Sequence, residues 1–207
     1  SMSFEEAALI EPLACALHGI ERLNVQPSDR IAVIGAGTIG LMLIESLKAY
    51  GVTDIVAYEM IPWRQKMAEK KGARAVRGAD ADLDKELECL KETFGWNQFD
   101  KVCVMAKDIK AMEMGLKLKG KGGKLLLFAT PAPEEYVKFY VSQAFFKGLE
   151  VLLTYSANHN NTREALRLID SKKVDAKSYI THRYALNELD KAIAQTIGRG
   201  ECLKCIV

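Results

Sequence analysis

The chain has 207 residues, of which 49% are hydrophobic and 27% charged, and this composition can bury a core and excludes an intrinsically disordered protein. Its 29 basic and 27 acidic residues leave a net charge of +2, which offers no electrostatic footprint for nucleic acid or an anionic membrane. No run approaches the roughly 18 to 20 apolar residues that a membrane span needs.

Residues 1–2 resemble a scar left by cleavage of an expression tag, so the native sequence is expected to begin near Ser3. Small and apolar residues then predict a buried helix within residues 3–23, which Pro12 must break or kink. Glu11 stands before this proline among apolar neighbours, where a carboxylate is out of place unless something binds it. The alternative is a charge that leaves the core at a helix end, and the residues alone favour neither.

A glycine turn follows the apolar strand predicted over residues 31–34 and opens the helix predicted over 38–50. Its glycines have the G-x-G-x-x-G spacing, which permits a tight turn, a close approach of backbone to a diphosphate, and close packing of helix on sheet. The free N–H groups of the first helical turn favour the same anion. The cofactor-binding candidates here are Gly35, Gly37, Thr38, Ile39 and Gly40.

Glu59 ends the second strand, predicted over residues 55–58, and lies 19 residues after Gly40. A carboxylate at this place can accept hydrogen bonds from both ribose hydroxyls of adenosine, and it repels a 2′-phosphate. The unit therefore predicts binding of NAD in preference to NADP. The alternative is a structural turn that binds no ligand.

Strands and helices continue to alternate as far as residue 155, which predicts a parallel sheet with helices on both faces. The six strands indicate an α/β doubly wound Rossmann fold that binds a dinucleotide at its switch point. The basic run 117–124, interleaved with glycines, is interpreted as a solvated turn. The further helices are expected at 62–71, 82–94, 109–118 and 141–146, and the further strands at 74–76, 101–105, 124–130 and 149–155.

The pattern changes after residue 156, where a polar turn precedes a helix at 162–170, an extended piece at 181–184 and a helix at 189–196. An apolar strand at 202–207 ends the chain and has no place in the predicted sheet. Because such a strand needs a partner, we expect its partner in a part of the protein that is missing here.

The five cysteines are odd in number and scattered, which fits a reducing cytoplasm rather than a disulfide framework. Cys202 and Cys205 form one C-x-x-C, but at three-residue separation in a strand their side chains should face opposite sides. Without a second pair, no zinc site is expected there. None of the three histidines stands at metal spacing from a carboxylate, so none is assigned to catalysis.

Four stretches together resemble the medium-chain zinc-dependent dehydrogenases, in particular the sorbitol (polyol) and the related threonine dehydrogenases. They are Phe4–Leu13, the glycine turn Gly35–Gly40, Thr181-His182-Arg183-Tyr184, and Gly200–Lys204. The resemblance implies that a GroES-like catalytic domain, which supplies zinc ligands, precedes this chain and is absent from it. It also implies an entry helix at residues 3–23, an NAD-binding Rossmann domain at 24–155 and a C-terminal return segment at 156–207.

The resemblance also implies roles for single residues. Glu11 matches the acid that contacts the catalytic zinc or its water, and Arg64 matches an arginine that lies against adenine and ribose, the alternative being an exposed helix charge. Tyr155 matches a tyrosine near the substrate, although Thr154 replaces the arginine that precedes it in the family. Thr130 is assigned to the cofactor.

The implied function of the intact enzyme is oxidation of a secondary alcohol or polyol, in which zinc acts as a Lewis acid and NAD accepts hydride. This fragment is expected to bind NAD without turnover. A strand equivalent to 149–154 pairs across a subunit dimer in the family, which implies a homo-oligomer. The alternatives are a non-catalytic NAD-binding or sensing module, a threonine dehydrogenase-type substrate, and a methyltransferase, whose glycine turn is usually G-x-G-x-G.

Overall fold

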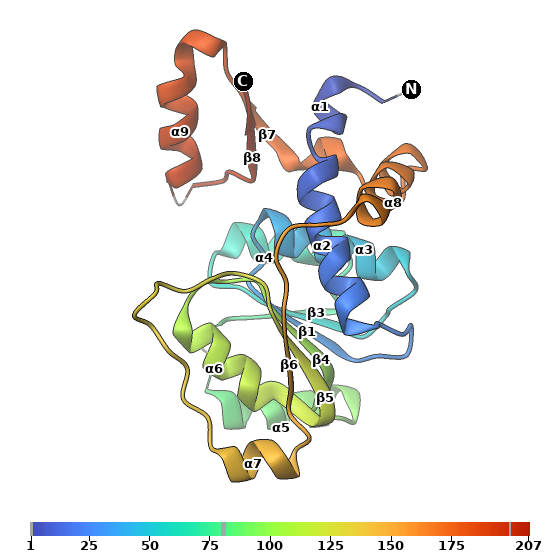
Figure 1. Cartoon of the computed structure of the whole chain (residues 1–207), viewed down its shortest axis with the longest axis vertical. Helices are drawn as coiled ribbons and strands as arrows, with labels where there is room; N and C mark the ends of the chain where they lie inside the picture. The colour runs from blue at the N-terminus through green and yellow to red at the C-terminus, as the bar shows by residue number, and fades with distance from the viewer. Residues whose placement is uncertain (1, 80–81, 199) are drawn as a thin grey trace.

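The computed structural model describes residues 2–79, 82–198 and 200–207. A parallel sheet with helices on both faces makes up most of the molecule, and a smaller unit built from the C-terminal segment stands at one end of it (Figure 1). The predicted α/β doubly wound fold is confirmed. The scar expected at residues 1–2 falls partly on residue 1, which lies outside the described residues.

Six parallel strands form the main sheet in the order β3-β2-β1-β4-β5-β6. The chain builds outward from β1 to one edge and then returns to the other side of β1, so the order reverses between β1 and β4. In doubly wound sheets this reversal opens the crevice that accepts a ligand. The strands are β1 (Ile31–Ile34), β2 (Ile55–Tyr58), β3 (Ala75–Arg77), β4 (Phe99–Val104), β5 (Lys119–Leu127) and β6 (Glu150–Leu153).

Two hydrophobic cores lie on opposite faces of this sheet because side chains alternate along each strand. In β1, Ile31 and Val33 pack with α2 and α3, whereas Ala32 and Ile34 pack with α5 and α6. No helix in the described ranges is both long and apolar enough to cross a membrane. The helices of this region are α2 (Ile10–Leu23), α3 (Thr38–Ala49), α4 (Pro62–Lys71), α5 (Leu83–Phe94) and α6 (Ile109–Leu118).

The entry segment contains two helices, α1 (Phe4–Ala7) and α2. The helix is interrupted at residues 8–9, between α1 and α2, and Pro12 lies in the first turn of α2. A proline is tolerated in that turn because its missing N–H would have no partner inside the helix.

Lys119 corrects the interpretation of the basic run as a solvated turn. Strand β5 begins at this residue, and the Lys119 side chain is only 2% exposed. Its Nζ donates to the carbonyls of Gly120, Lys147 and Gly148 at 3.0, 3.1 and 3.3 Å, and burial lowers its pKa. At Gly123 a Cβ would stand 2.8 Å from the Asp100 carbonyl oxygen. This glycine is needed for close pairing with β4 and is no sign of an open turn.

The last strand is also different from the expectation. Strand β8 (Lys204–Ile206) pairs in parallel with β7 (Ile180–Arg183) in a separate two-stranded sheet, so its partner lies within this chain. The expectation of a missing partner was wrong because sequence periodicity does not report which strands pair. The remaining elements are α7 (Val141–Phe146), α8 (His159–Asp170), the 3-10 turns Ala176–Tyr179 and Leu186–Glu188, and α9 (Leu189–Ile197).

Candidate functional site

The glycine turn lies at the carboxyl end of β1, at the switch point of the sheet. Gly35 has a φ of +97°, a conformation that favours glycine, and its N–H donates to the Tyr58 carbonyl of β2 at 2.8 Å. At Gly40, an added Cβ would lie 2.0 Å from the Gly35 carbonyl oxygen. Two of the three glycines are therefore demanded by the turn itself.

Glu59 connects the end of β2 to this turn. Its carboxylate accepts the N–H of Ala36 at 2.8 Å and the N–H groups of Met60 and Ile61 at 2.9 Å each. The residue is 7% exposed. The spacing alone predicts an acid beside the ribose, but it does not reveal that the same carboxylate fixes the backbone of the glycine turn.

Helix α3 begins at the same switch point. Gly37 is its N-cap and supplies no side-chain hydrogen bond to the first turn. The Thr38 hydroxyl is already used, because it donates to the Leu203 carbonyl at 2.7 Å. Ile39 packs partly buried against the core. The turn thus presents backbone to a ligand, while Thr38 fastens the C-terminal segment beside it.

Arg64 has a buried hydrogen-bond donor that is not satisfied by the described residues. Its Nε is buried without a hydrogen-bond partner, a state shared among the described residues only by the Ser46 hydroxyl. Its Nη1 lies 4.0 Å from the position that a Cβ on Gly37 would take. Buried donors are almost always paired, and a dinucleotide beside Gly37 would supply oxygen acceptors. The residues present therefore fit this cofactor.

The residues around Glu11 do not make a zinc centre by themselves. Glu11 is exposed in the first turn of α2, and its carboxylate accepts a hydrogen bond from the Cys15 thiol at 3.3 Å. Burial, together with this carboxylate, raises the pKa of Cys15 to about 11. Protein zinc sites have three or four protein ligands, and no third candidate ligand joins this pair in the part of the chain that the structure describes.

The substrate candidate Tyr155 and the cofactor candidate Thr130 lie beyond the carboxyl ends of β6 and β5, at the same end of the strands as the glycine turn. Tyr155 is 93% exposed, and Thr130 is exposed. Neither side chain makes a hydrogen bond within residues 2–79, 82–198 and 200–207. The Thr154 hydroxyl lies 3.1 Å from Nδ1 of His18, which is also 2.9 Å from the Ser156 carbonyl. No described contact brings Tyr155 and Glu11 together.

A pocket of about 360 Å³ is found at the opposite end of the strands from the glycine turn, near the amino ends of β5 and β6. It is remote from the glycine turn, since parallel strands all point their carboxyl ends the same way. Its volume therefore does not identify the dinucleotide site. The charged residues in its lining are Glu113, Lys117, Lys119, Lys138 and Lys147.

The expectation that the side chains of Cys202 and Cys205 face opposite sides is wrong. The Sγ atoms of Cys202 and Cys205 are 3.6 Å apart, on one side of the chain. Strand β8 begins only at Lys204, so Cys202 precedes it and does not follow the alternation of a strand. No residue pattern in the sequence predicts the bend at Leu203.

Comparison with known proteins gives consistent results. A family model described as zinc-binding dehydrogenase matches residues 38–171. The chain is 29% identical over 210 residues to sorbitol dehydrogenase of Bacillus subtilis (strain 168), covering 100% of this chain and 58% of that protein. It is 30% identical over 202 residues to L-threonine 3-dehydrogenase of Bacillus velezensis, covering 97% and 57%.

Among solved structures, a short chain alcohol dehydrogenase from E. coli CFT073, complexed with NADH, superposes with a TM-score of 0.87. At 20% identity, with 98% of this chain and 59% of that one covered, this likeness shows the fold alone. The chain spans somewhat more than half the length of the relatives it matches.

Proposed function

The chain belongs to the zinc-binding dehydrogenase family, and from this premise we propose that it is the NAD-binding part of an oxidoreductase acting on a secondary alcohol or polyol. The observation that carries the proposal is the arrangement at the switch point, where Glu59 fixes the glycine turn and Arg64, with its unpartnered Nε, lies near Gly37. A cytoplasmic location belongs to the same proposal and rests on cysteine usage alone.

The roles of the residues follow from their positions. The bare backbone of Gly37 admits the diphosphate, and the N–H groups that begin α3 stabilise its charge. Arg64 would pair its buried Nε with the adenosine half. Glu59 would accept the ribose hydroxyls with the lone pairs that its three backbone contacts leave free. Bound NAD supplies the hydride acceptor.

Glu11 and Tyr155 remain predictions for the substrate side. Glu11 would stand next to a zinc only if further ligands reached it from outside the described residues, and Tyr155 would need a substrate to order its exposed ring. Sorbitol dehydrogenase and L-threonine 3-dehydrogenase match this chain almost equally well. The comparison therefore favours neither a polyol nor an amino-acid substrate, and the resemblance of the entry segment to polyol dehydrogenases supports the former.

Calorimetric titration of the 207-residue chain with NAD⁺, NADP⁺ and S-adenosylmethionine tests the cofactor. We expect NAD⁺ to bind at least about tenfold more tightly than NADP⁺, which corresponds to roughly 1.4 kcal/mol of repulsion between Glu59 and the 2′-phosphate. Arg64→Ala should weaken NAD⁺ binding by about tenfold because it removes charge-assisted hydrogen bonds, and the exposed Arg163→Ala should not. Saturation by S-adenosylmethionine alone would identify a methyltransferase instead.

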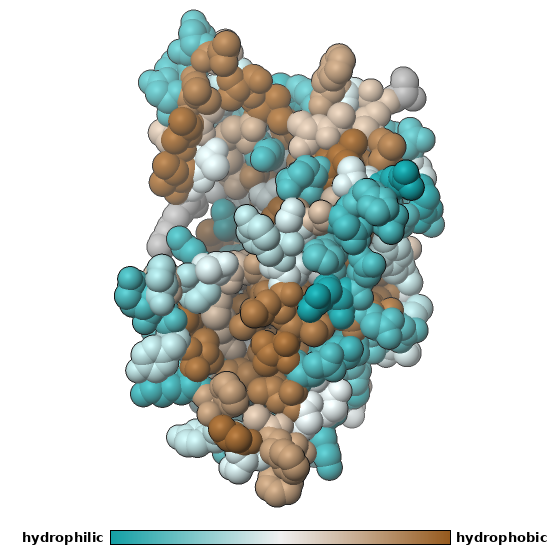
Figure 2. Space-filling view, viewed as in Figure 1, coloured by the Kyte–Doolittle hydropathy of each residue, from teal (hydrophilic) through white to brown (hydrophobic). Residues whose placement is uncertain are grey.

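The free edge of the sheet supports a homo-oligomer. Strand β6 is an edge strand whose side chains are largely exposed, with Leu153 at 67%. An apolar surface covers this region and the neighbouring α7 (Figure 2). Unpaired edge strands with apolar side chains readily pair with another chain. The exposed apolar residues are Val141, Phe145, Phe146, Val151 and Leu153.

Replacing Leu153 tests this edge. Leu153→Lys should raise the dissociation constant of a dimer by about tenfold or more, because facing lysines repel across an edge-to-edge pair. Ile193→Lys on α9 changes an apolar residue of similar exposure, 51%, away from β6, and it should leave the dimer intact. Analytical ultracentrifugation measures both. A monomeric wild-type chain, or equal dissociation in the two variants, would contradict the proposed pairing.

A further inference from the structure

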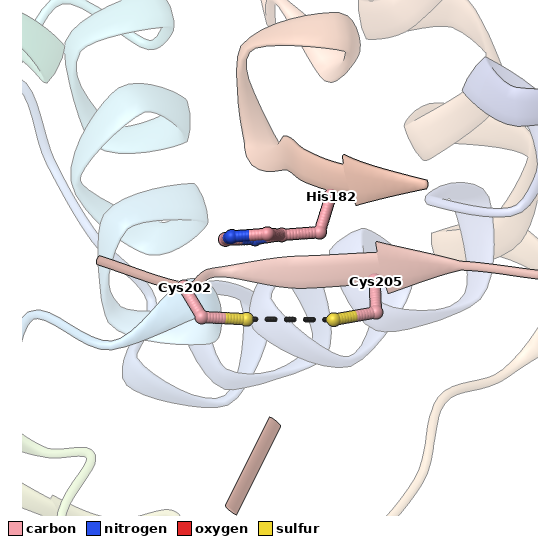
Figure 3. A group of neighbouring side chains, drawn as sticks. All are labelled: His182, Cys202 and Cys205. Carbon is pink, nitrogen blue, oxygen red and sulfur yellow. Dashed lines mark hydrogen bonds between the residues drawn. The ribbon is translucent and has the colours of Figure 1, made fainter. Parts of the chain in front are cut away.

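Three potential metal ligands converge in the small C-terminal sheet. They are His182 of β7, Cys205 of β8 and Cys202, which lies just before β8. One ligand atom from each lies within 4.8 Å of the other two. Figure 3 shows the thiols of Cys202 and Cys205 pointing towards each other beneath β8. The His182 ring extends from β7 and lies between the ribbons of β7 and β8 in this view.

The backbone explains why these residues meet. Ile180 pairs with Lys204, but a register shift then places His182 opposite Cys205. A regular ladder would have put Ile206 opposite His182, so the irregularity brings imidazole and thiol together. The bend before β8 is held by two hydrogen bonds at Leu203, whose N–H donates to Thr181 Oγ1 at 3.1 Å and whose carbonyl accepts from Thr38 at 2.7 Å.

The sulfur separation suits a tetrahedral cation. Two thiolates bound at about 2.3 Å with a tetrahedral angle have their sulfur atoms about 3.8 Å apart. The Sγ atoms of Cys202 and Cys205 are 3.6 Å apart. Two thiolates and one imidazole form a soft ligand set that favours zinc over magnesium or calcium.

The hydrogen bonds around Thr181 prepare the imidazole for this role. The Thr181 hydroxyl donates to the Lys204 carbonyl at 3.3 Å, so its oxygen accepts from its other neighbours. Nδ1 of His182 lies 3.0 Å from this oxygen, and with the hydroxyl proton on the Lys204 carbonyl the tautomer that fits is the one protonated at Nδ1. Nε2 is left with a free lone pair. Metal-bound histidines are usually oriented in this way by a hydrogen bond from the other ring nitrogen.

We propose that His182, Cys202 and Cys205 bind one thiophilic divalent cation of the zinc class, with a fourth position open to water or an external ligand. The site lies in the C-terminal segment, and none of its three ligands is among the residues assigned to the dinucleotide or to the substrate. Binding releases protons from the thiols. It also cross-links the two strands at the bend that contacts Thr38.

Cobalt(II) tests the site because thiolate–cobalt bonds absorb in the near ultraviolet. The 207-residue chain, stripped with chelator and kept in a phosphine reductant that prevents a disulfide, is titrated with Co²⁺ alone. We expect a charge-transfer band that saturates at one equivalent and is abolished by added Zn²⁺. The double variant Cys202→Ser/Cys205→Ser should lose the band, and His182→Gln should weaken binding by about tenfold.

Matched controls separate this site from the other thiols. Cys89→Ser, at the exposed thiol of α5, should keep the band. Cys15→Ser should keep it as well, and loss in that variant would place the cobalt beside Glu11 and overturn the proposal. Far-ultraviolet circular dichroism of the metal-free variants verifies folding. A wild-type chain without the band, or a double variant that retains it, would equally refute the site, whatever the outcome of the NAD titration.

Discussion

Replacing Gly40 by alanine is expected to lower the stability of the chain by about 3 kcal/mol, which corresponds to a fall of roughly 6–12 °C in Tm for a protein of this size. The added Cβ would lie 2.0 Å from the Gly35 carbonyl oxygen and 3.1 Å from its carbon. Both are backbone atoms, so no side-chain rotation relieves the clash. Either α3 must move off the sheet, or the turn that Glu59 holds must open.

Gly40 has an ordinary helical backbone, so the loss cannot be assigned to conformational strain. Alanine is favoured over glycine by about 0.8–1.0 kcal/mol in a helix interior. Helix propensity alone would make the alanine variant more stable, so any loss of stability is caused by the steric clash. Differential scanning calorimetry without ligand gives the Tm, and NAD⁺ titration at a temperature where the variant remains folded gives the second readout. We expect binding to weaken as well, since the same turn faces the diphosphate.

Gly37→Ala is the matched control in the same turn. A Cβ at Gly37 would meet nothing closer than Nη1 of Arg64 at 4.0 Å, and the preference of an N-cap for glycine over alanine is about 1 kcal/mol or less. Its Tm should fall by no more than about 4 °C, less than that of the Gly40 variant, while its NAD⁺ affinity falls because the Cβ stands in the way of the diphosphate. Equal Tm values for both variants would show that Gly40 is not required by packing.

The sequence predicted well those parts of the fold in which local pattern and tertiary structure agree. The strand Ile31–Ile34 is fully buried and the helix from Thr38 begins where the glycines end, so apolar run and turn chemistry indicate the same boundaries. The parallel pairing of the strands follows from the alternation of strands and helices, because parallel strands require crossovers.

The misses at Lys119 and at the last strand involve contacts between segments distant in sequence. Lys119 is buried because the carbonyls of residues 147 and 148 reach its ammonium group, and a lysine among glycines resembles a surface turn until that contact is known. Likewise, His182 meets Cys205 only through an irregular register between β7 and β8. Glu59 was expected from spacing, but its hydrogen bond to Ala36 required the folded turn.

Glu59→Gln is expected to weaken NAD⁺ binding by about 100-fold, or roughly 2.8 kcal/mol. The carboxylate accepts three backbone N–H groups, from Ala36, Met60 and Ile61. A glutamine of the same shape has one acceptor oxygen and an NH₂ group that cannot accept, so at least one of these donors loses its partner in a site that is only 7% exposed. Hydrogen bonds to charged groups contribute about 1.5–3 kcal/mol each. The turn should loosen, and the ribose should lose its acceptor.

The choice of coenzyme distinguishes the two roles of this carboxylate. If Glu59 faces the ribose, removing its charge also removes the repulsion of a 2′-phosphate, so the preference for NAD⁺ over NADP⁺ should shrink while both bind more weakly. If it only anchors the turn, both affinities fall by the same factor and the ratio stays unchanged, and the ribose assignment is then wrong. Glu69→Gln makes the same charge change at an exposed position of α4. It should alter neither affinity, since its carboxylate is in solvent and charges there are screened within about 10 Å at moderate ionic strength.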